Sequence, residues 1–247
     1  MIPPTTDDIR LMERLHVKAW PAFETANIGG WLWRYSGGGS QRANSVSTVD
    51  FTGDDPDAAL DEAEARYRAK GVRSQFHTFN LTRPAGLPDR LRARGYREGE
   101  ATLTLFKSPE PGVVPADIEQ TDAPTPDWRA VYLGAITESR RAVNARILDT
   151  IPGPRAFFAC RQDGRVISTA LSVTGFGAAV VECVATAVEA RRQGGAEAVL
   201  RALEGWAHAQ GVAAIGLQVV ATNTPALALY QRLGFVQGAA NRFWVRD

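Results

Sequence analysis

The chain of 247 residues is 45% hydrophobic and carries 28 basic and 27 acidic side chains, which gives a formal net charge of +1. That length allows one large domain or two ordinary ones, and the near-neutral charge provides no general field for a nucleic acid or a membrane surface. Two cysteines are too few for a disulfide framework, and three histidines beside them offer no metal-ligand spacing. The N-terminus is too acidic for a signal peptide and no apolar run could span a bilayer, so we expect a cytoplasmic protein without a metal.

The first part of the chain is predicted to mix helices and strands. Helical apolar spacing runs from Asp8 to about Trp20. A hairpin is expected over residues 29–51, with an aromatic strand, a glycine turn, and a second strand in which Ala43, Ser45, Ser47 and Val49 alternate. The remaining expected elements are a helix over 56–70, a strand over 73–80, a helix over 87–95 and a strand over 101–107.

Residues 108–128 are proline-rich and lack periodicity, so they are predicted to be a linker. We place a domain boundary near Pro111, which gives an N-terminal domain of residues 1–110 and a C-terminal domain of residues 111–247. The expected elements beyond it are helix over 128–148, three strands within 155–186, a helix over 195–210, a strand over 214–220, a helix over 224–234 and a strand over 241–245. Both parts are therefore mixed α/β.

A faint internal echo links the two parts. Aligning Gly95-Tyr96 with Gly234-Phe235 matches two segments that each run short helix, glycine-aromatic pair, loop and strand. The alignment sets Leu91 opposite Tyr230. A structural repeat and chance agreement both remain open.

The stretch ARRQGGA, residues 190–196, lies between a predicted strand and a predicted helix. The first turn of a helix has N–H groups without intrahelical acceptors and a partial positive charge, so it can bind an anion such as a pyrophosphate. Glycine removes the Cβ that would obstruct a close approach, and Arg191 and Arg192 add positive charge nearby. The alternative is an ordinary strand-to-helix turn that uses glycine for its backbone freedom.

Neither of the two common phosphate motifs fits this turn. The P-loop requires Lys-Ser or Lys-Thr after the glycines, and the dinucleotide fingerprint requires an acid at the end of the next strand, which here ends VVATN. Arg191-x-x-Gly194-x-Ala196 instead resembles the acyl-CoA pyrophosphate signature of the GNAT N-acetyltransferase superfamily. Downstream, the segment from Asn223 through Tyr230 to Gly234-Phe235 is similar to the closing motif of that family. The resemblance covers roughly residues 115–247 and implies a GNAT-like α/β fold with a mixed sheet.

The resemblance implies acetyl-CoA as cosubstrate, bound where two parallel strands separate. The end of the strand over 180–186, at Val184, Ala185 and Thr186, would pair with the pantetheine arm as an added strand does. A backbone N–H of this strand would polarise the thioester carbonyl. The turn residues expected to hold the pyrophosphate are Arg191, Arg192, Gln193, Gly194, Gly195 and Ala196.

Tyr230 matches the usual general acid of the family, which protonates the departing thiolate. Its helix is well marked, since Thr224 can cap it and Pro225 suits its first turn. Asn223, at the end of the second separating strand, is implied to touch the cofactor or to order water. The alternatives are a tyrosine packed with its hydroxyl at the surface, and an asparagine that serves only the turn.

Glu182 lies among valines in a central strand, where a charge is costly unless it is paired or faces a cavity. Strand alternation sets it on one face with Val180, Val184 and Thr186, and Cys183 on the other as a core residue. The family often has its general base here, and burial would raise the pKa of this carboxyl toward a useful value. An ion pair with a neighbouring helix and a wet strand end are the alternatives.

The first part departs from the GNAT pattern, because it lacks the glycine signature and has Leu91 in place of the tyrosine. It resembles degenerate N-terminal halves of two-domain acetyltransferases. Such a half could wall the acceptor pocket, with Trp33, Arg42 and Asn44 contacting substrate. A glycine-rich hairpin with solvated side chains is the alternative.

The sequence therefore predicts an N-acetyltransferase that transfers acetyl from acetyl-CoA to a primary amine by direct attack. A non-catalytic acyl-CoA sensor and an interaction module that binds nothing at the turn are the competing interpretations. The acceptor, a small-molecule or peptide amine, is not identified, although the near-neutral charge disfavours polyamines. Both a monomer and a homodimer remain open.

Overall fold

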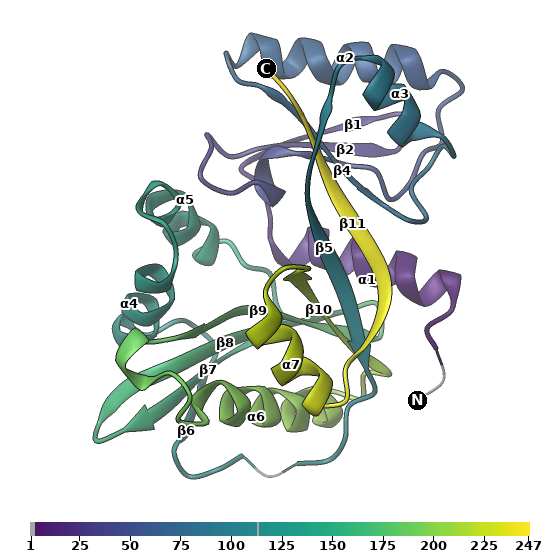
Figure 1. The fold of residues 1–247 in the computed structure, drawn as a ribbon. Coiled ribbons are helices and arrows are strands. Elements are labelled where there is room, and N and C mark those ends of the chain that lie inside the picture. Colours follow the sequence, from purple (N-terminus) through teal and green to yellow (C-terminus); the bar gives the residue numbers. More distant parts are fainter. Residues whose placement is uncertain (1–2, 113) are drawn as a thin grey trace.

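The computed structural model describes residues 3–112 and 114–247, and within them one eleven-stranded mixed sheet has the order β1-β2-β3-β4-β11-β5-β10-β9-β8-β7-β6 (Figure 1). The elements in chain order are α1 (Thr6–Ala19), β1 (Glu24–Ile28), β2 (Trp31–Tyr35), η1 (Arg42–Asn44), β3 (Val46–Ser47), α2 (Pro56–Ala69), β4 (Ser74–Phe79), α3 (Leu87–Ala93), β5 (Arg97–Lys107), β6 (Ile118–Thr121), α4 (Pro126–Ala135), α5 (Glu138–Leu148), β7 (Arg155–Gln162), β8 (Arg165–Gly175), β9 (Ala178–Thr186), η2 (Val188–Ala190), α6 (Gly195–Ala209), β10 (Ala214–Val220), α7 (Thr224–Arg232) and β11 (Val236–Arg246). The mixed α/β prediction is confirmed.

The last strands of the two parts are exchanged across the middle of the sheet. β5, which ends the first part, pairs antiparallel with β10 of the second, while β11, which ends the second part, pairs antiparallel with β4 of the first. β5 and β11 also pair with each other, and they run side by side through the molecule in Figure 1. Hydrogen bonding of the sheet therefore continues across the boundary near Pro111, and the division there stays a prediction.

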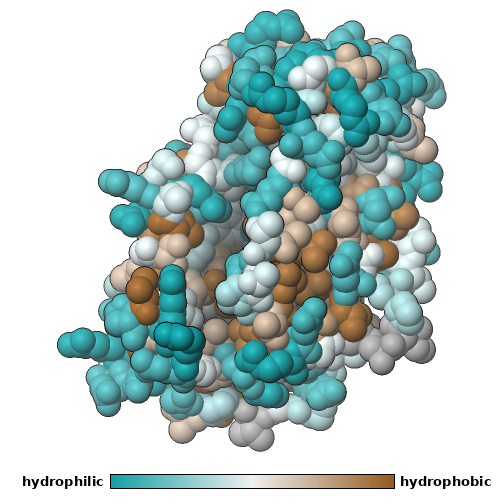
Figure 2. Space-filling model, viewed as in Figure 1, coloured by the Kyte–Doolittle hydropathy of each residue, from teal (hydrophilic) through white to brown (hydrophobic). Residues whose placement is uncertain are grey.

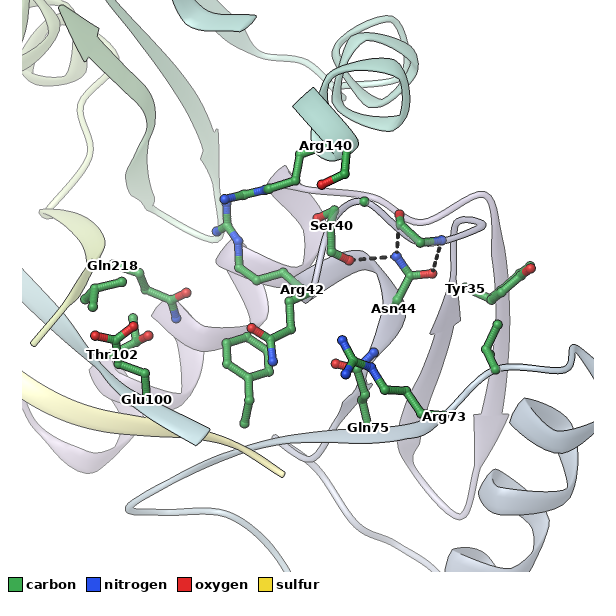
Figure 3. A pocket seen from close by; sticks show the side chains of 17 residues that line it. Tyr35, Ser40, Arg42, Asn44, Arg73, Gln75, Glu100, Thr102, Arg140 and Gln218 are labelled. Carbon is green, nitrogen blue, oxygen red and sulfur yellow. Dashed lines mark hydrogen bonds between the residues drawn. The ribbon is translucent and has the colours of Figure 1, made fainter. Parts of the chain in front are cut away.

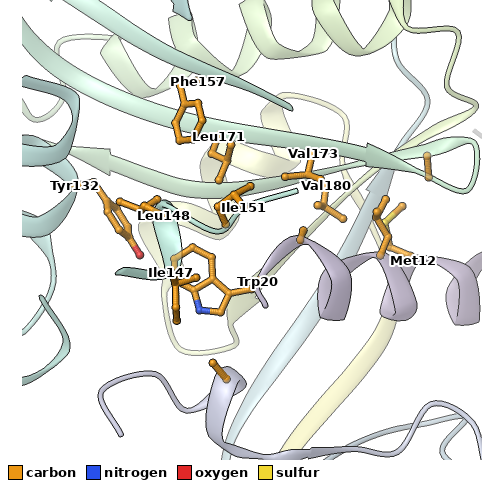
Figure 4. Packing of buried hydrophobic residues seen from close by; sticks show 14 of the residues in the cluster. Met12, Trp20, Tyr132, Ile147, Leu148, Ile151, Phe157, Leu171, Val173 and Val180 are labelled. Atoms are coloured by element: carbon orange, nitrogen blue, oxygen red, sulfur yellow. The ribbon is translucent and has the colours of Figure 1, made fainter. Parts of the chain in front are cut away.

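Three apolar clusters bury the faces of this sheet. One joins α1 to α4, α5 and the strands β7 to β9, with Met12 and Trp20 packed against residues of the second part (Figure 4). A second lies between the other face of those strands and α6 and α7, and a third between β1 to β4 and α2 and α3. Because α1 buries its apolar stripe on the second part, the first helix of the chain helps to hold the two parts together.

Two local predictions are only partly correct. The aromatic strand β2 pairs antiparallel with β3 as expected, but β3 spans only two residues, residues 42–44 form a 3-10 turn, and β2 also forms a tighter hairpin with β1 around Gly29-Gly30. The cause is Asn44, whose side chain bonds the backbone of residues 36–40 and closes a loop where a strand was expected. The expected linker over 108–128 contains β6, which pairs with β7, and its Val113 lies outside the described residues.

Hydrophilic side chains cover most of α2 and α3 at the top of the molecule in Figure 2, as expected for helices that bury only one face. In the part of the chain that the structure describes, none of the helices has the length and apolar character needed to cross a membrane. The N-terminal residues used to judge a signal peptide include Met1 and Ile2, which lie outside that part.

Candidate active site

Strands β9 and β10 separate halfway along their length. Their parallel pairing runs from Ala178 opposite Ala214 to Val181 opposite Leu217 and goes no further. Beyond this point β9 stays with β8, and β10 stays with β5. The inner edge of residues 182–186 therefore has no strand partner, and its backbone is free to pair with an extended ligand. Val184, Ala185 and Thr186 lie on this edge, although the Thr186 hydroxyl is 2.6 Å from that of Ser168.

A β-bulge at Cys183 marks the point of separation. Cys183 has a φ of 55°, and the register with β8 shifts so that Leu171 faces Glu182 while Thr169 faces Ala185. The bulge ends the simple alternation, so the prediction of one face for Val180, Glu182, Val184 and Thr186 is wrong. Cys183 packs against the same cluster as Val180, and Val184 packs on the opposite side, beside α6.

The thiol of Cys183 is unsuited to be a nucleophile. Burial raises its pKa well above the ordinary value, and the charge of Glu182 raises it further. Only the thiolate attacks, so the expectation that Cys183 is a core residue agrees with its surroundings, although its face was predicted wrongly.

The glycine pair at the start of α6 serves two different purposes. Gly194 is the N-cap, with a φ of 86° that favours glycine, and it makes no side-chain cap. A Cβ on Gly195 would lie 2.9 Å from the Ser168 hydroxyl, so Gly195 allows α6 to pack closely on β8. Packing against the sheet is therefore one reason for the second glycine, and the predicted room for a phosphate stays a prediction.

Backbone donors converge at this helix start. Within residues 3–112 and 114–247, the N–H groups from Arg192 to Glu197 donate to no protein acceptor. Arg191, Arg192 and Gln193 are exposed beside them, and Arg192 has a φ of 63°. Unpaired helix N–H groups with adjacent positive charge are the elements of a phosphate site, and these residues fit the diphosphate of acetyl-CoA.

Helix α7 presents Tyr230 close to the end of the separated strands. Asn223, and not Thr224 as predicted, is the N-cap, since its side-chain oxygen accepts the N–H of Ala226 at 3.3 Å. Tyr230 is 7% exposed and packs edge-to-face on Phe235. Its hydroxyl has no protein hydrogen bond among the described residues. Burial, together with the charge of Glu182, raises the pKa of Tyr230 to about 12, so the phenol keeps its proton at neutral pH.

Glu182 is held by two side chains of the first part. Arg42 donates Nη1 to Oε1 at 2.7 Å and Nη2 to Oε2 at 2.5 Å, and His16 Nδ1 lies 3.2 Å from Oε1. Burial alone would raise the pKa of Glu182, but the charge and hydrogen bonds of Arg42, with the contact from His16, lower it to about 2. The expected rise of this pKa is therefore wrong, and the alternative of an ion pair is what the structure contains.

An open cavity of about 850 Å³ lies between the first part and the separated strands (Figure 3). Arg42 and Asn44 line it, as does Gln218 at the diverging end of β10. The amide of Asn44 is occupied by the backbone of its own loop (Figure 3). Trp33 does not line the cavity, because it is buried between Tyr35 and Tyr67 in the core of the first part.

A buried carboxylate on α1 was not predicted from the sequence. Glu13 is 2% exposed and accepts from the hydroxyl of Thr104 at 2.6 Å, from Asn241 Nδ2 at 3.1 Å and from Gln218 Nε2 at 3.0 Å. It lies one turn before His16, among the buried residues of α1. These contacts come from three strands that are distant in sequence, so only the folded chain reveals them.

A mixed sheet whose central parallel strands separate at a bulge, with an uncapped helix start after one strand and a tyrosine-bearing helix after the other, defines a GNAT-type acetyltransferase, here in a tandem arrangement. The chain belongs to the family described as "Probable histone acetyltransferase Rv0428c C-terminal", whose model matches residues 6–244.

Relatives of similar length support this assignment. The chain is 29% identical over 240 residues to the "Uncharacterized N-acetyltransferase YobR" of Bacillus subtilis (strain 168), an alignment that covers 93% of this chain and 95% of that protein. A GCN5-related N-acetyltransferase from Kribbella flavida is similar in structure, with a TM-score of 0.68 at 17% identity over 96% of this chain and 93% of that one. A tandem GNAT protein from the clavulanic acid biosynthesis pathway has a TM-score of 0.62 at 16% identity, over 100% of this chain and 89% of that one. At these identities the solved structures show a similar fold and nothing further.

Proposed function

We propose that this GNAT-type acetyltransferase is acetyl-CoA-dependent and transfers the acetyl group directly to a primary amine. The observation that carries the proposal is the row of unaccepted N–H groups from Arg192 to Glu197, which is adjacent in the chain to the unpaired edge of β9. A diphosphate and an extended pantetheine arm have the spacing of charge and hydrogen-bond groups that such a continuous surface can bind.

Bound acetyl-CoA would supply the activated acetyl thioester. In this proposal the N–H groups of the turn from Arg192 to Ala196 hold the diphosphate, with the side chain of Arg191 beside them. The backbone of Val184, Ala185 and Thr186 orients the arm, and an N–H released by the bulge at Cys183 polarises the thioester carbonyl. Asn223 fixes the start of α7 and thereby positions Tyr230.

Tyr230 is the proposed general acid. The amine nitrogen forms a bond to the acetyl carbon, the carbon–sulfur bond breaks, and the phenol proton of Tyr230 goes to the departing sulfur. The pKa of about 12 keeps that proton available at neutral pH. The proton lost by the attacking amine goes to solvent, which enters through the open cavity, and solvent returns a proton to the Tyr230 phenolate, whose pKa of about 12 favours the phenol at neutral pH.

Glu182 receives a changed role in this proposal. Both of its oxygens are engaged by Arg42, and a carboxyl with a pKa of about 2 is a poor proton acceptor at neutral pH. We therefore propose Glu182 as a positioning residue that fixes Arg42 at the cavity wall. The acceptor is a small-molecule or peptide amine, and the protein acts as a monomer or a homodimer.

Replacement of Tyr230 by Phe tests the proposal. We expect kcat to fall about 10- to 100-fold, because general acid catalysis contributes at least that much and the thiolate leaves fairly readily, while calorimetric CoA affinity stays within two-fold. Free CoA thiol released in the presence of an amine panel reports turnover, and Tyr96→Phe, at a buried tyrosine of the first part outside the cavity lining, is a matched control. An acyl-CoA sensor would bind CoA with no turnover to lose, and an interaction module would give no heat of CoA binding at all.

A further inference from the structure

The cavity beside the separated strands carries an excess of positive charge. Its charged lining residues are Arg42, Arg73, Arg140 and Glu100. Arg42 is neutralised by Glu182, and Glu100, which accepts the hydroxyl of Thr222 at 2.5 Å, keeps its negative charge, so the lining with Glu182 has a formal excess of one positive charge. Within residues 3–112 and 114–247, the guanidinium groups of Arg73 and Arg140 make no ion pair or side-chain hydrogen bond.

These two arginines come from different elements. Arg140 lies in the first turn of α5 of the second part, and Arg73 directly precedes β4 of the first. Figure 3 shows them on different walls of the cavity. In a chain with a net charge of only +1, two unpaired guanidinium groups at one cavity are a local concentration of charge. Each presents several donors that match a carboxylate.

A buried amide next to them is also incompletely satisfied. Gln75 is 8% exposed and lines the same cavity, and its Oε1 has no hydrogen-bond partner in the described part of the chain. Buried polar atoms usually find a partner, and an amide oxygen without one at a cavity wall indicates a hydrogen-bond donor, such as an N–H group, supplied by a ligand. The cavity volume of about 850 Å³ suits a small molecule.

We infer that the acceptor is an amine that also carries a carboxylate, the chemical class of amino acids. This inference rests on the proposed acetyl transfer and names its substrate class. Arg73 and Arg140 bind the carboxylate, which leaves the amine directed toward Gln218 and the separated strands. A lysine-rich peptide or a polyamine brings further positive charge to the same wall and is repelled by it.

Matched amines test the inference. The panel contains α- and ω-amino acids of increasing length, the corresponding amines without the carboxylate, spermidine and a lysine-rich peptide, with CoA release as the readout. We expect the best carboxylated amine to exceed its partner at least ten-fold in kcat/KM. Arg73→Gln and Arg140→Gln should each remove most of that preference, measured as the ratio of kcat/KM within each matched pair. Arg68→Gln, at an exposed arginine on α2 outside this lining, is the control and should keep that ratio.

The outcomes distinguish a wrong substrate class from a wrong proposed function. The inference is overturned if acetyl-CoA binds but carboxylated amines do not react, react no better than their partners, or react less well than the cationic acceptors. Acetyl transfer from acetyl-CoA is then judged separately by the Tyr230→Phe experiment. If calorimetry detects no binding of acetyl-CoA, it is the proposed function that fails.

Discussion

Helices α2 and α6 occupy equivalent positions, since each connects two neighbouring parallel strands of the sheet. Their first turns are opposite in character. At α2 the carboxylate of Asp55 accepts the N–H groups of Asp57 at 2.9 Å and Ala58 at 3.1 Å, and Pro56 has no N–H to offer. At α6 the N-cap is Gly194, and the first-turn N–H groups of the described chain donate to no protein atom. The first turn of α2 is therefore capped by an acid of the chain, while the first turn of α6 has N–H groups available to an anion.

The short helices that follow repeat this contrast. Tyr96 N–H donates to the Leu91 carbonyl, and Phe235 N–H donates to the Tyr230 carbonyl, each at 3.0 Å. The two aligned segments therefore end their helices with the same turn, in agreement with the alignment of Gly95-Tyr96 with Gly234-Phe235, yet one copy buries a leucine where the other presents a phenol. The comparison teaches that similar backbone elements in the two parts differ in their caps and in single side chains, which is where the proposed function distinguishes them.

The largest expected effect comes from breaking the link between the parts. Arg42→Gln leaves Glu182 buried without its partner, so we expect the free energy of unfolding to fall by about 3–5 kcal/mol. Urea denaturation measures it. Arg42→Gln combined with Glu182→Gln should recover most of the loss, because two neutral amides do not leave a buried charge. A double variant as unstable as the single one would show that the ion pair is not the cause.

The same pair has a defined pH dependence. The pKa of Glu182 falls from 4.5 to about 2 on folding, so its stabilising contribution is complete above about pH 4.5 and is lost as the pH falls toward 2. In Arg42→Gln, burial acts on Glu182 without the arginine and raises its pKa, so the deficit of that variant should shrink on acidification. Denaturation curves between pH 3 and 7 distinguish the two profiles.

A second prediction concerns an acid placed at the N-cap of α6, as Asp55 is at the N-cap of α2. Gly194→Asp would bring a carboxylate to the anion site, and Gly194→Asn is its neutral control, since both residues tolerate the left-handed backbone. We expect CoA to bind about 10- to 100-fold more weakly to the aspartate variant than to the asparagine variant, which corresponds to roughly 1.4–2.7 kcal/mol. Equal affinities by calorimetry would mean that the diphosphate lies elsewhere.

Much of this comparison could be predicted from the sequence, because its signals are local. Helix periodicity, the glycine turn and the motif from Asn223 to Phe235 each lie within a few turns of chain. The start of α2 at Pro56 was also predicted, since proline is common in a first helical turn, but its cap by Asp55 was not. The sequence predicted the position of the glycine turn. It did not predict that close contact with Ser168 requires a glycine at Gly195.

The remaining features depend on contacts between distant segments. No local pattern indicates that Cys183 forms a bulge, and the alternation used for Glu182 fails at that residue. Arg42 and His16 reach Glu182 only because α1 and η1 fold onto the second part. Charge pairing of this kind reverses the pKa direction that burial alone predicts, and it becomes visible only when the tertiary structure is known.

The smallest expected effect comes from opening the closed helix. Asp55→Ala removes the cap of α2, so we expect unfolding to become easier by about 1 kcal/mol, while Asp54→Ala removes the same charge and leaves the cap intact. CoA affinity should be unchanged in both variants, because Pro56 still lacks an N–H and Asp57 still brings negative charge to that first turn. Calorimetry that detected a second CoA site in Asp55→Ala would contradict this expectation. It would mean that the Asp55 cap alone prevents the first turn of α2 from binding CoA.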